Sequence, residues 1–481
     1  MNPSLASLVY ACGIAGLFYL DRDESARTSK ALWLPVLYLW IIGSRPISDW
    51  LGVAPSADVD VQLEGSPVDR AFFLVLLIAA VCVLIHRGPR TLKVLNTNWP
   101  ILAFYLYCLV SVIWSDFSAV SFKRWTKAIA DVAMIVIIVT DGQPVAALRR
   151  IFARVGFILI PASLLYIKYY PALGRNYDPW TGAQFNTGVT LNKNILGSTT
   201  YLLLLGATWR LLALLRSDEQ TVHRNRHLLA QGSLLAMGIY LLTITHSSTS
   251  SLCFAIGVGL LLVTSIRFVR LHAGSVHVIV LILLVTAGMA ALLAGTGGVA
   301  SALGRDSTFS GRTDIWADVI PLAPNWLVGA GFESFWLSPY VHQRLAVLIP
   351  GLPLNEAHNG YIEIYLELGC VGLGLLVLVL IDGYRRSVSA FRREPALASL
   401  FIAYILTAVV YCLTEAGFRM VGAIWIFLLL SIIGASVIAS GVPLRGTKLL
   451  DTSKEGSNES RTKNPLTPAT SRSDYRWKTI R

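Results

Sequence analysis

The chain has 481 residues, of which 54% are hydrophobic and only 14% charged, and its mean hydropathy is +0.61. Soluble domains carry about a quarter charged residues, so this composition excludes a soluble protein and indicates an all-α polytopic membrane protein. The formal net charge of +12 would favour nucleic-acid binding in a soluble protein, but basic residues in a membrane protein chiefly set topology. We therefore expect no nucleic-acid partner.

Apolar runs of membrane length recur along most of the chain. The first run starts without charge and lacks a clear cleavage site, so we predict a membrane span there rather than a signal peptide. Thirteen spans are predicted, with one more or one fewer left open: 4–20, 31–43, 71–86, 99–114, 124–140, 150–167, 191–209, 228–245, 251–268, 276–294, 359–381, 396–413 and 420–440.

Lys and Arg are distributed unequally between the two sides of these spans. One set of connections carries 19 Lys and Arg residues, and the opposite set, much longer in total, carries 12. The set with 19 consists of 21–30, 86–98, 141–154, 210–227, 265–277 and 382–394. The positive-inside rule places this set in the cytoplasm, together with a polar, basic and disordered tail after residue 440. The long connection 295–358 then lies outside, and a loop of this length is usually functional.

Basic residues also stand in or beside the predicted outer connections, where topology disfavours them. They include Arg124, Lys193, Arg305 and Arg312. Each could simply pair with a nearby carboxylate, as Arg312 could with Asp314 or Asp318. Several cations on one face favour an anionic ligand instead, a phosphate or pyrophosphate, which arginine binds with two parallel N–H groups.

His358 stands where the long outer connection ends and an apolar helix begins. It could be a polar cap at the membrane interface. The positive end of the helix dipole favours an anion nearby and disfavours the imidazolium, which would leave a neutral ring able to accept a proton near pH 7. Glu356 and Asn359 flank it and could fix its tautomer.

Two pairs of ionisable residues lie in or next to the late spans. Glu363 and Glu367 are one turn apart in the predicted helix, and we expect each to pair with an Arg or Lys of a neighbouring helix rather than to act in catalysis. Glu415 and Arg419 are spaced for a second such pair at positions i and i+4.

Other chemistry has weak support in the sequence. The six cysteines fall in different apolar runs and are predicted to be small buried side chains. His342, Glu333, Glu356 and His358 lack a metal-ligand spacing, and no glycine-rich nucleotide loop occurs on the cytoplasmic side. We expect no metal and no cofactor, and a substrate that reaches the membrane already activated.

Several motifs together resemble the O-antigen ligase and polymerase superfamily, and most of all its exopolysaccharide-polymerase branch. The pair His358-Asn359 is followed by nine residues and then Gly369-Cys370-Val371-Gly372, which is similar to the most specific pattern of the family. Further stretches resemble other family elements, in the expected order: 111-SVIWSDFSAVSFKRW-125, 192-NKNILGS-198, 311-GRTDIW-316, 328-VGAGFESF-335 and 413-LTEA-416. One departure is Thr249, which stands where family members often have a basic residue, and it favours polymerase over ligase.

The resemblance implies a GT-C-like fold of about 12–13 transmembrane helices in the bacterial inner membrane, with its active site on the periplasmic face. It implies an inverting, metal-independent glycosyltransferase whose donor is a glycan on undecaprenyl pyrophosphate. By position, His358 would be the general base and Arg312 the pyrophosphate anchor. The resemblance and the outer-face position together nominate further substrate contacts, which are Arg124, Lys193, Asn194, Arg305 and Asn359.

We divide the chain accordingly into transmembrane helices 1–187, a ligase/polymerase-like core 188–380 that contains the loop 295–358, helices 381–440 and the tail 441–481. The implied activity is polymerisation of lipid-linked repeat units, with membrane lipid and a chain-length regulator as further partners.

Three alternatives remain open. A ligase would move a finished glycan to lipid A core or to a protein. A lipid-linked sugar transporter would place charges deep in several spans, and a structural scaffold would not need basic outer loops.

Overall fold

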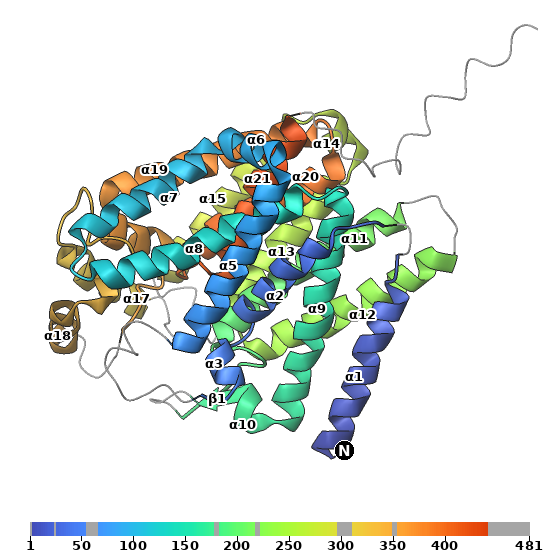
Figure 1. Ribbon diagram of the computed structural model, residues 1–481, viewed down its shortest axis with the longest axis horizontal. Helices are drawn as coiled ribbons and strands as arrows, with labels where there is room; N and C mark the ends of the chain where they lie inside the picture. The colour runs from blue at the N-terminus through green and yellow to red at the C-terminus, as the bar shows by residue number, and fades with distance from the viewer. Residues whose placement is uncertain are drawn as a thin grey trace, which may run out of the picture. The chain divides into compact units, whose positions relative to one another are not determined.

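The computed structural model describes residues 2–23, 26–53, 66–177, 182–216, 222–295, 310–348 and 354–440, and these residues are mainly helical (Figure 1). The elements in chain order are α1 (Pro3–Leu20), η1 (Lys30–Leu32), α2 (Trp33–Ile42), α3 (Ile47–Trp50), α5 (Pro67–Arg87), α6 (Pro89–Thr97), α7 (Trp99–Ser111), η2 (Val112–Trp114), α8 (Ser118–Val139), α9 (Pro144–Tyr169), α10 (Pro171–Gly174), β1 (Arg175–Tyr177), β2 (Gln184–Asn186), α11 (Lys193–Leu215), α12 (Val222–Thr245), α13 (Ser248–Val263), α14 (Arg267–Leu271), α15 (Ser275–Gly295), α17 (Ser310–Val319), η3 (Ile320–Leu322), η4 (Phe335–Leu337), α18 (Pro339–Leu348), α19 (Gly360–Phe391), α20 (Pro395–Tyr411) and α21 (Ala423–Ala439). The predicted all-α architecture is confirmed. Arg305 and the tail after residue 440 lie outside the described residues.

Every predicted span overlaps a helix, although the span 251–268 runs across the break between α13 and α14. Within the described residues, six helices are long and apolar enough to cross a membrane, and a seventh crossing arises if α6 and the helix that follows it, bent by 82°, form one span. Five further apolar helices have only 10–17 residues. They are Lys30–Ile42, which contains α2, the part Ser275–Met289 of α15, and the helices α13, α20 and α21. The chain is therefore a multi-pass membrane protein, while the number of crossings stays a prediction.

One apolar core joins most of the helices between α1 and α21, whereas the apolar residues of α17 and α18 belong to a second, smaller core. Helices α20 and α21 are buried along almost their whole length; they pack against each other and against α11 and α19. The boundary drawn at residue 380 falls inside α19. The prediction that all six cysteines are buried is wrong for the exposed Cys12, Cys82 and Cys370.

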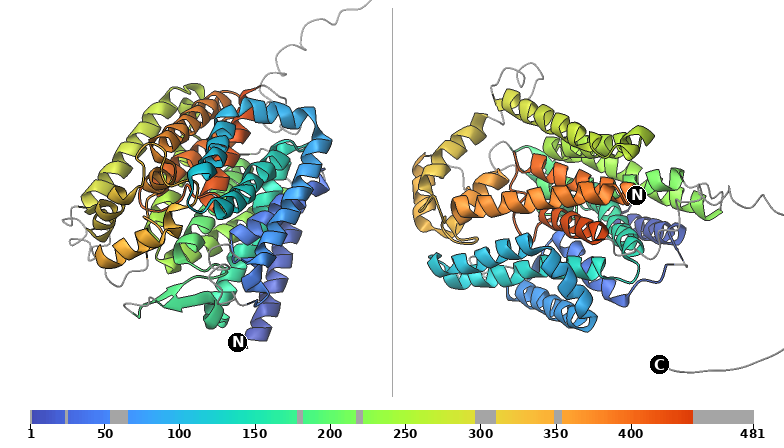
Figure 2. Two further views of the ribbon diagram at one scale, coloured as in Figure 1. Left: turned by 60° about the vertical axis from the view of Figure 1, so that its left-hand side comes forward. Right: turned by 90° about the horizontal axis from the view of Figure 1, so that it is seen from above.

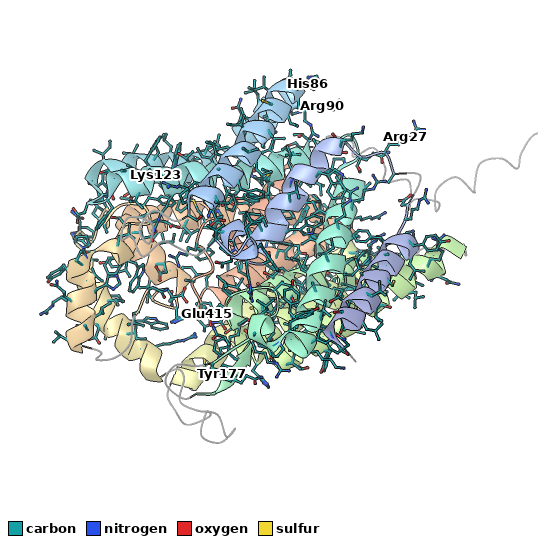
Figure 3. All side chains as sticks on the ribbon, turned by 60° about the horizontal axis from the view of Figure 1, so that its bottom comes forward. Arg27, His86, Arg90, Lys123, Tyr177 and Glu415 are labelled. Atoms are coloured by element: carbon teal, nitrogen blue, oxygen red, sulfur yellow. The ribbon has the colours of Figure 1, made fainter. Side chains whose placement is uncertain are left out.

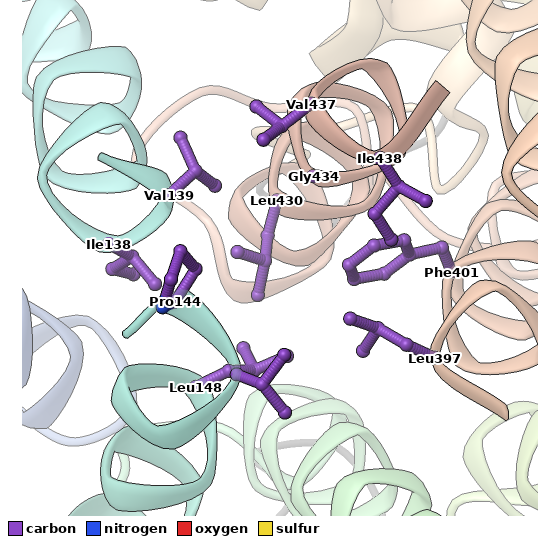
Figure 4. Close-up of a pocket in the computed structure, with 11 residues that line it drawn as sticks. Ile138, Val139, Pro144, Leu148, Leu397, Phe401, Leu430, Gly434, Val437 and Ile438 are labelled. Atoms are coloured by element: carbon purple, nitrogen blue, oxygen red, sulfur yellow. The ribbon is translucent and has the colours of Figure 1, made fainter. Parts of the chain in front are cut away.

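An apolar pocket opens among α8, α9, α20 and α21 (Figure 4). Only apolar residues line it, among them Leu148, Phe401 and Leu430. The lining residues lie toward the end of α8, the start of α9 and the start of α20. Glu415 and Arg419, in contrast, lie between the end of α20 and the start of α21. The pocket therefore contributes no polar group to that site.

Helix α19 is interrupted in its interior at Gly369, where φ is 63° and ψ is −163°. The carbonyls of Leu366 and Glu367 would normally accept from residues 370 and 371. They accept instead from the N–H groups of Ala330 (3.0 Å) and Gly331 (2.8 Å). Backbone groups at membrane depth must be satisfied within the protein, and the segment 326–331 supplies partners here.

The same segment also accepts the donors that the interruption releases. The N–H of Cys370 donates to the carbonyl of Trp326 at 3.0 Å, and the N–H of Val371 donates to that of Leu327 at 3.1 Å. Gly329 allows this close approach because a Cβ there would lie 2.4 Å from the carbonyl carbon of Glu367. This exchange of hydrogen bonds explains why the two glycine-containing motifs occur together: they dock one backbone onto the other.

The residues 310–348 form a small helical unit against the start of α19 (Figure 2). Apolar side chains of this unit, including Val319 and Phe335, share a core with Ala357 and Leu366. The unit therefore brings α17, which carries Arg312, toward the residues that precede α19.

Gly369→Ala should destabilise the protein because ψ near −163° with positive φ belongs to a region that only glycine occupies readily. Such strain costs about 1–3 kcal/mol, and the new Cβ would also lie 2.3 Å from the backbone of Leu327. We expect a clearly lower midpoint of thermal unfolding in detergent.

Gly374→Ala is the matched control, since it lies in the same helix and a Cβ there meets nothing within 4 Å. Equal midpoints for the two variants would contradict this explanation of the interruption.

Candidate functional site

The start of α19 is fixed by Asn359. Its side-chain oxygen accepts from the N–H groups of Tyr361 at 2.9 Å and Ile362 at 3.1 Å, while its side-chain nitrogen donates to the carbonyl of Leu413 at 3.1 Å. This is an N-cap that satisfies free donors of the first helical turn. His358 therefore lies just before the helix, with a positive φ of 50°, a strained conformation that is found disproportionately at functional sites.

The connection between α20 and α21, residues 412–422, lies against this helix start. Gly360 donates its N–H to the carbonyl of Cys412 at 2.9 Å. The far end of the connection is held by Asp131 of α8, which accepts from the N–H of Val421 at 2.8 Å and from the hydroxyl of Tyr38 at 2.7 Å. The connection is thus anchored at both ends.

The imidazole of His358 faces two carboxylates. Its Nδ1 atom is 2.9 Å from Oε1 of Glu356 and 3.5 Å from Oε2 of Glu415. These distances suit ion pairs, although the buried Nδ1 makes no well-aligned hydrogen bond to either. Nε2 has no hydrogen-bond partner among the described residues, and the side chain is 29% exposed.

Glu415 is buried and gathers partners from three other parts of the chain. Its Oε1 is 3.0 Å from Nη2 of Arg312, and its Oε2 accepts from the side-chain nitrogen of Asn194 at 3.0 Å, in addition to facing His358. Arg312 also donates through Nη1 to the carbonyl of Thr414. A buried carboxylate is tolerated only with such partners.

A second arginine reaches the other carboxylate. Nη1 of Arg419 is 3.9 Å from Oε2 of Glu356, and the Arg419 side chain is 44% exposed. We call the six residues Asn194, Arg312, Glu356, His358, Glu415 and Arg419 the Glu415 cluster. Figure 3 shows Glu415 and Tyr177 toward one side of the molecule and Arg27, His86 and Arg90 toward another.

Charge within the cluster determines how His358 is protonated. Burial lowers the pKa of His358, but the carboxylates of Glu356 and Glu415 outweigh it and raise the pKa from 6.5 to about 9. Burial raises the pKa of Glu356, but His358, Arg419 and Arg312 lower it below its ordinary value. His358 is therefore an imidazolium at pH 7. The prediction of a neutral ring is wrong, because two nearby carboxylates outweigh the helix dipole.

The cluster unites some of the predicted site residues and leaves out others. His358, Arg312 and Asn194 come together, and Asn359 adjoins them as the helix cap. Lys193 precedes Asn194 but is exposed, with its ammonium 5.7 Å from the ring centre of Phe185.

Arg124 lies outside the cluster. It donates to the carbonyl of Glu333 at 2.9 Å and faces its carboxylate at 3.4 Å. Arg305 lies outside the described residues, so its place stays a prediction.

The predicted pairing of Glu415 with Arg419 is wrong. The i,i+4 rule applies to helices, but residues 412–422 form turns. Arg312, from a segment a hundred residues away in sequence, pairs with Glu415 instead. The sequence contained the signal of a lone acid in a short apolar connection, but nothing in it identified the partner.

Glu363 also differs from its prediction. Its carboxylate accepts from the indole N–H of Trp336 at 2.7 Å and from the backbone N–H of Ala357; Arg419 interacts with it electrostatically, but the described residues form no ion pair with it. Neutral donors therefore satisfy the carboxylate of Glu363. Through its hydrogen bond with Ala357, Glu363 holds the backbone that leads to His358.

A cation could in principle meet three ligand atoms in the cluster, since atoms of Glu356, His358 and Glu415 lie within 4.8 Å of one another. However, Arg312 and Arg419 already face these two carboxylates. The residues fit an internally balanced set of charges better than a metal site.

The arrangement can perform proton transfer next to an anion. A nitrogen of a histidine held by carboxylates is a strong base once it is neutral. Two arginines nearby can stabilise negative charge on phosphate oxygens. Both functions come together within one cluster.

Comparison with known proteins agrees with the resemblance inferred from the motifs. Residues 232–377 match the family described as O-antigen ligase. The chain is also 28% identical to the exopolysaccharide production protein ExoQ of Rhizobium meliloti (strain 1021) over 313 residues, which are 63% of this chain and 68% of that protein. The family match includes Arg312 and His358 but ends before Glu415 and Arg419.

The two carboxylates should control the titration of His358. We expect its imidazole to titrate near pH 9, and Glu356→Gln or Glu415→Gln to lower that midpoint, because each removes a charge that stabilises the imidazolium. Histidine-labelled NMR spectra of the full chain in detergent can check this, with the signal assigned by its loss in His358→Gln.

His277 provides a comparison within the same spectrum, since it contacts the hydroxyl of Tyr384 rather than a carboxylate. A His358 midpoint near 6.5 that neither variant moves would contradict the geometry described above.

Proposed function

We propose that this protein is a polysaccharide polymerase that transfers a glycan from undecaprenyl pyrophosphate to a sugar hydroxyl at the periplasmic face of the bacterial inner membrane. Its likeness to an exopolysaccharide production protein and to O-antigen ligases supports a glycosyltransferase-like role in exopolysaccharide biosynthesis. The observation that carries the proposal is the contact of His358 with Glu356 and Glu415, next to two arginines.

In the proposed reaction the acceptor hydroxyl attacks the anomeric carbon of the donor. Its oxygen forms a bond to that carbon while the bond from the carbon to the phosphate oxygen breaks, which inverts the anomeric configuration. The hydroxyl proton passes to Nε2 of His358, the nitrogen that points away from the carboxylates. The lipid pyrophosphate leaves with the bonding electrons.

The carboxylates have two opposing effects on this base. They orient the ring through Nδ1 and increase its basicity, as an acid partner does for histidine in other sites. They also keep it protonated at neutral pH, where a group of pKa about 9 is only about 1% neutral. The reaction therefore requires loss of a proton before transfer.

The donor brings its own activation, so the proposal requires no nucleotide or other cofactor. With His358 neutral, Arg312 and Arg419 balance Glu356 and Glu415; the proton that His358 accepts from the acceptor hydroxyl adds one positive charge as the pyrophosphate leaves. Positive charge that develops in this way can stabilise the leaving group without a metal ion. Metal independence remains part of the proposal.

Ligase activity is the second candidate, because the matching family is described as O-antigen ligase. It would use the same donor and the same cluster and differ in the acceptor, which would be lipid A core or a protein. Chain growth and transfer to such an acceptor give different products.

His358→Ala should abolish polymer formation in cells, because general-base catalysis contributes about a hundred- to ten-thousand-fold in rate. Lipid-linked single repeat units should accumulate while the protein still inserts into the membrane. Chain length is read on gels and the lipid-linked units by mass spectrometry. Normal polymer from this variant would rule out the assigned base.

The rate should rise as the pH increases from 7 toward 9. Neutral His358 is the active form, and its pKa is about 9, so each step down in pH removes base. The kcat/KM of the purified enzyme measures this, and Glu356→Gln should move the rising limb to lower pH. A rate that falls steadily over this range would oppose a histidine base with that pKa.

A further inference from the structure

Asp131 is an acid in the interior of a predicted membrane span. It stands seven residues after the start of the span 124–140, about 10 Å along the helix axis at about 1.5 Å per residue, and its side chain is fully buried. An acid at such a depth is costly, and it commonly marks an ion pathway or binds a partner within the protein. The proposed reaction does not use Asp131, so its role needs a separate explanation.

Neutral donors hold the carboxylate of Asp131. Its Oδ1 accepts from the hydroxyl of Tyr38 at 2.7 Å, and its Oδ2 accepts from the backbone N–H of Val421 at 2.8 Å. Three further groups interact with it electrostatically, namely Tyr105, Lys127 and Glu333. Among the described residues no ion pair includes Asp131. Both of its oxygens are therefore occupied, which favours an attachment within the protein over an ion pathway.

The backbone that Asp131 holds is strained. Val421 has a positive φ of 60°, which is a clear outlier for a β-branched residue. Such strain persists only where surrounding contacts hold the backbone in place. Val421 also lies in a turn rather than in a helix, and a backbone N–H at membrane depth must find its acceptor within the protein. Asp131 provides that acceptor.

Arg419 stands two residues before Val421, and its guanidinium is the shared counter-ion of four carboxylates. They are those of Glu333, Glu356, Glu363 and Glu367. Nη1 of Arg419 is 3.9 Å from Oε2 of Glu356, while Glu363 and Glu367 are buried. Displacement of Arg419 would take away the cation that acts on these buried acids, which is strongly unfavourable.

We propose that Asp131 is a positioning residue for the proposed glycan transfer, and that it acts through the strained backbone of Val421 on the place of Arg419. This inference rests on the proposed function. Through Arg419 it affects Glu356, whose Oε1 is 2.9 Å from Nδ1 of His358. An acid inside the membrane thereby controls the charge around the base without touching the substrate.

Apolar packing also holds this part of the connection. The ring centre of Phe418 is 5.1 Å from that of Tyr361, and Met420 is buried. Packing provides no acceptor for the N–H of Val421, however, so it does not replace the hydrogen bond to Asp131.

Glycan transfer by the purified full-length chain in lipid, with a defined undecaprenyl-pyrophosphate glycan, tests the role of Asp131. Asp131→Ala should lower kcat by about five- to a hundred-fold, the usual effect of leaving a buried N–H without an acceptor. Asp131→Asn should retain most of the rate, because its amide can accept from Val421 and donate to Tyr38. An Asn variant as slow as the Ala variant would overturn the proposal, since the negative charge would then be what matters.

Thr126→Ala is the matched control in α8. Its hydroxyl donates to the carbonyl of Phe122 in the same helix at 3.0 Å, so this variant should transfer glycan at the unaltered rate. A loss equal to that of Asp131→Ala would show a general sensitivity of α8 and contradict a specific role of Asp131.

The strain at Val421 provides an independent test. Val421→Gly in the Asp131→Ala background should recover part of the lost rate, because glycine adopts a positive φ without strain. Val421→Ala in the same background retains a Cβ and should recover much less. Equal rates for the two double variants would rule out strained backbone as the link.

The titration of His358 separates positioning from a general loss of stability. The charged groups around its imidazole are Glu356, Glu415, Arg312 and Arg419. In folded protein, Asp131→Ala should move the midpoint in the same direction and by a similar amount as Arg419→Gln. Combined with Arg419→Gln it should move the midpoint no further. A midpoint that Arg419→Gln moves and Asp131→Ala does not would contradict the proposal.

Amide exchange in the unaltered chain needs no variant to fold. The N–H of Val421 should exchange about as slowly as that of Ile426, which donates to the carbonyl of Gly422 at 3.1 Å. Exchange as fast as in an exposed turn would overturn the attachment to Asp131. Titration and exchange do not require activity, so failure of the proposed function is distinguishable: it would show as polymer formation that survives His358→Ala.

Discussion

A buried carboxylate needs cations or hydrogen-bond donors around it, and Glu415 obtains them from parts of the chain that are far apart in sequence. Asn194 comes from the start of α11, Arg312 from α17 and His358 from the residues before α19. Without these partners Glu415 would be an uncompensated charge. The need to satisfy one acid therefore brings together the residues that the motifs had suggested separately, and it fixes the position of the imidazole.

The backbone hydrogen-bonding groups of α19 also need partners from a distant part of the chain. The interruption of α19 at Gly369 releases two carbonyls and two N–H groups, and the segment 326–331 takes up all four. This docks the helical unit of residues 310–348 onto α19 and places Arg312 close to the helix start. An uninterrupted helix would satisfy its own backbone and provide no such attachment. The glycines thus act on the site through the position of a whole segment.

The helices were predictable because each follows an apolar run, and each predicted run overlaps a helix. Only six helices of the described residues are long and apolar enough to cross a membrane by themselves, so the thirteen crossings stay a prediction. His358, Arg312 and Asn194 were identified from motifs and from basic residues in unexpected connections. The protonation of His358 was not predictable, because it depends on Glu356 and Glu415 together, and Glu415 is 57 positions away in the sequence. The partner of Glu415 was missed for a similar reason: the i,i+4 spacing to Arg419 has meaning only in a helix, and residues 412–422 form turns.

We propose that the Glu415 cluster transfers a glycan from a lipid pyrophosphate with His358 as base and without a metal. The most direct measurement uses the purified chain in lipid with a defined undecaprenyl-pyrophosphate glycan and EDTA. We expect longer lipid-linked glycans and released undecaprenyl pyrophosphate, and no products from His358→Ala. Absence of transfer by the unaltered chain in EDTA, with activity restored by a divalent cation, would contradict it, as would chain growth that persists in His358→Ala.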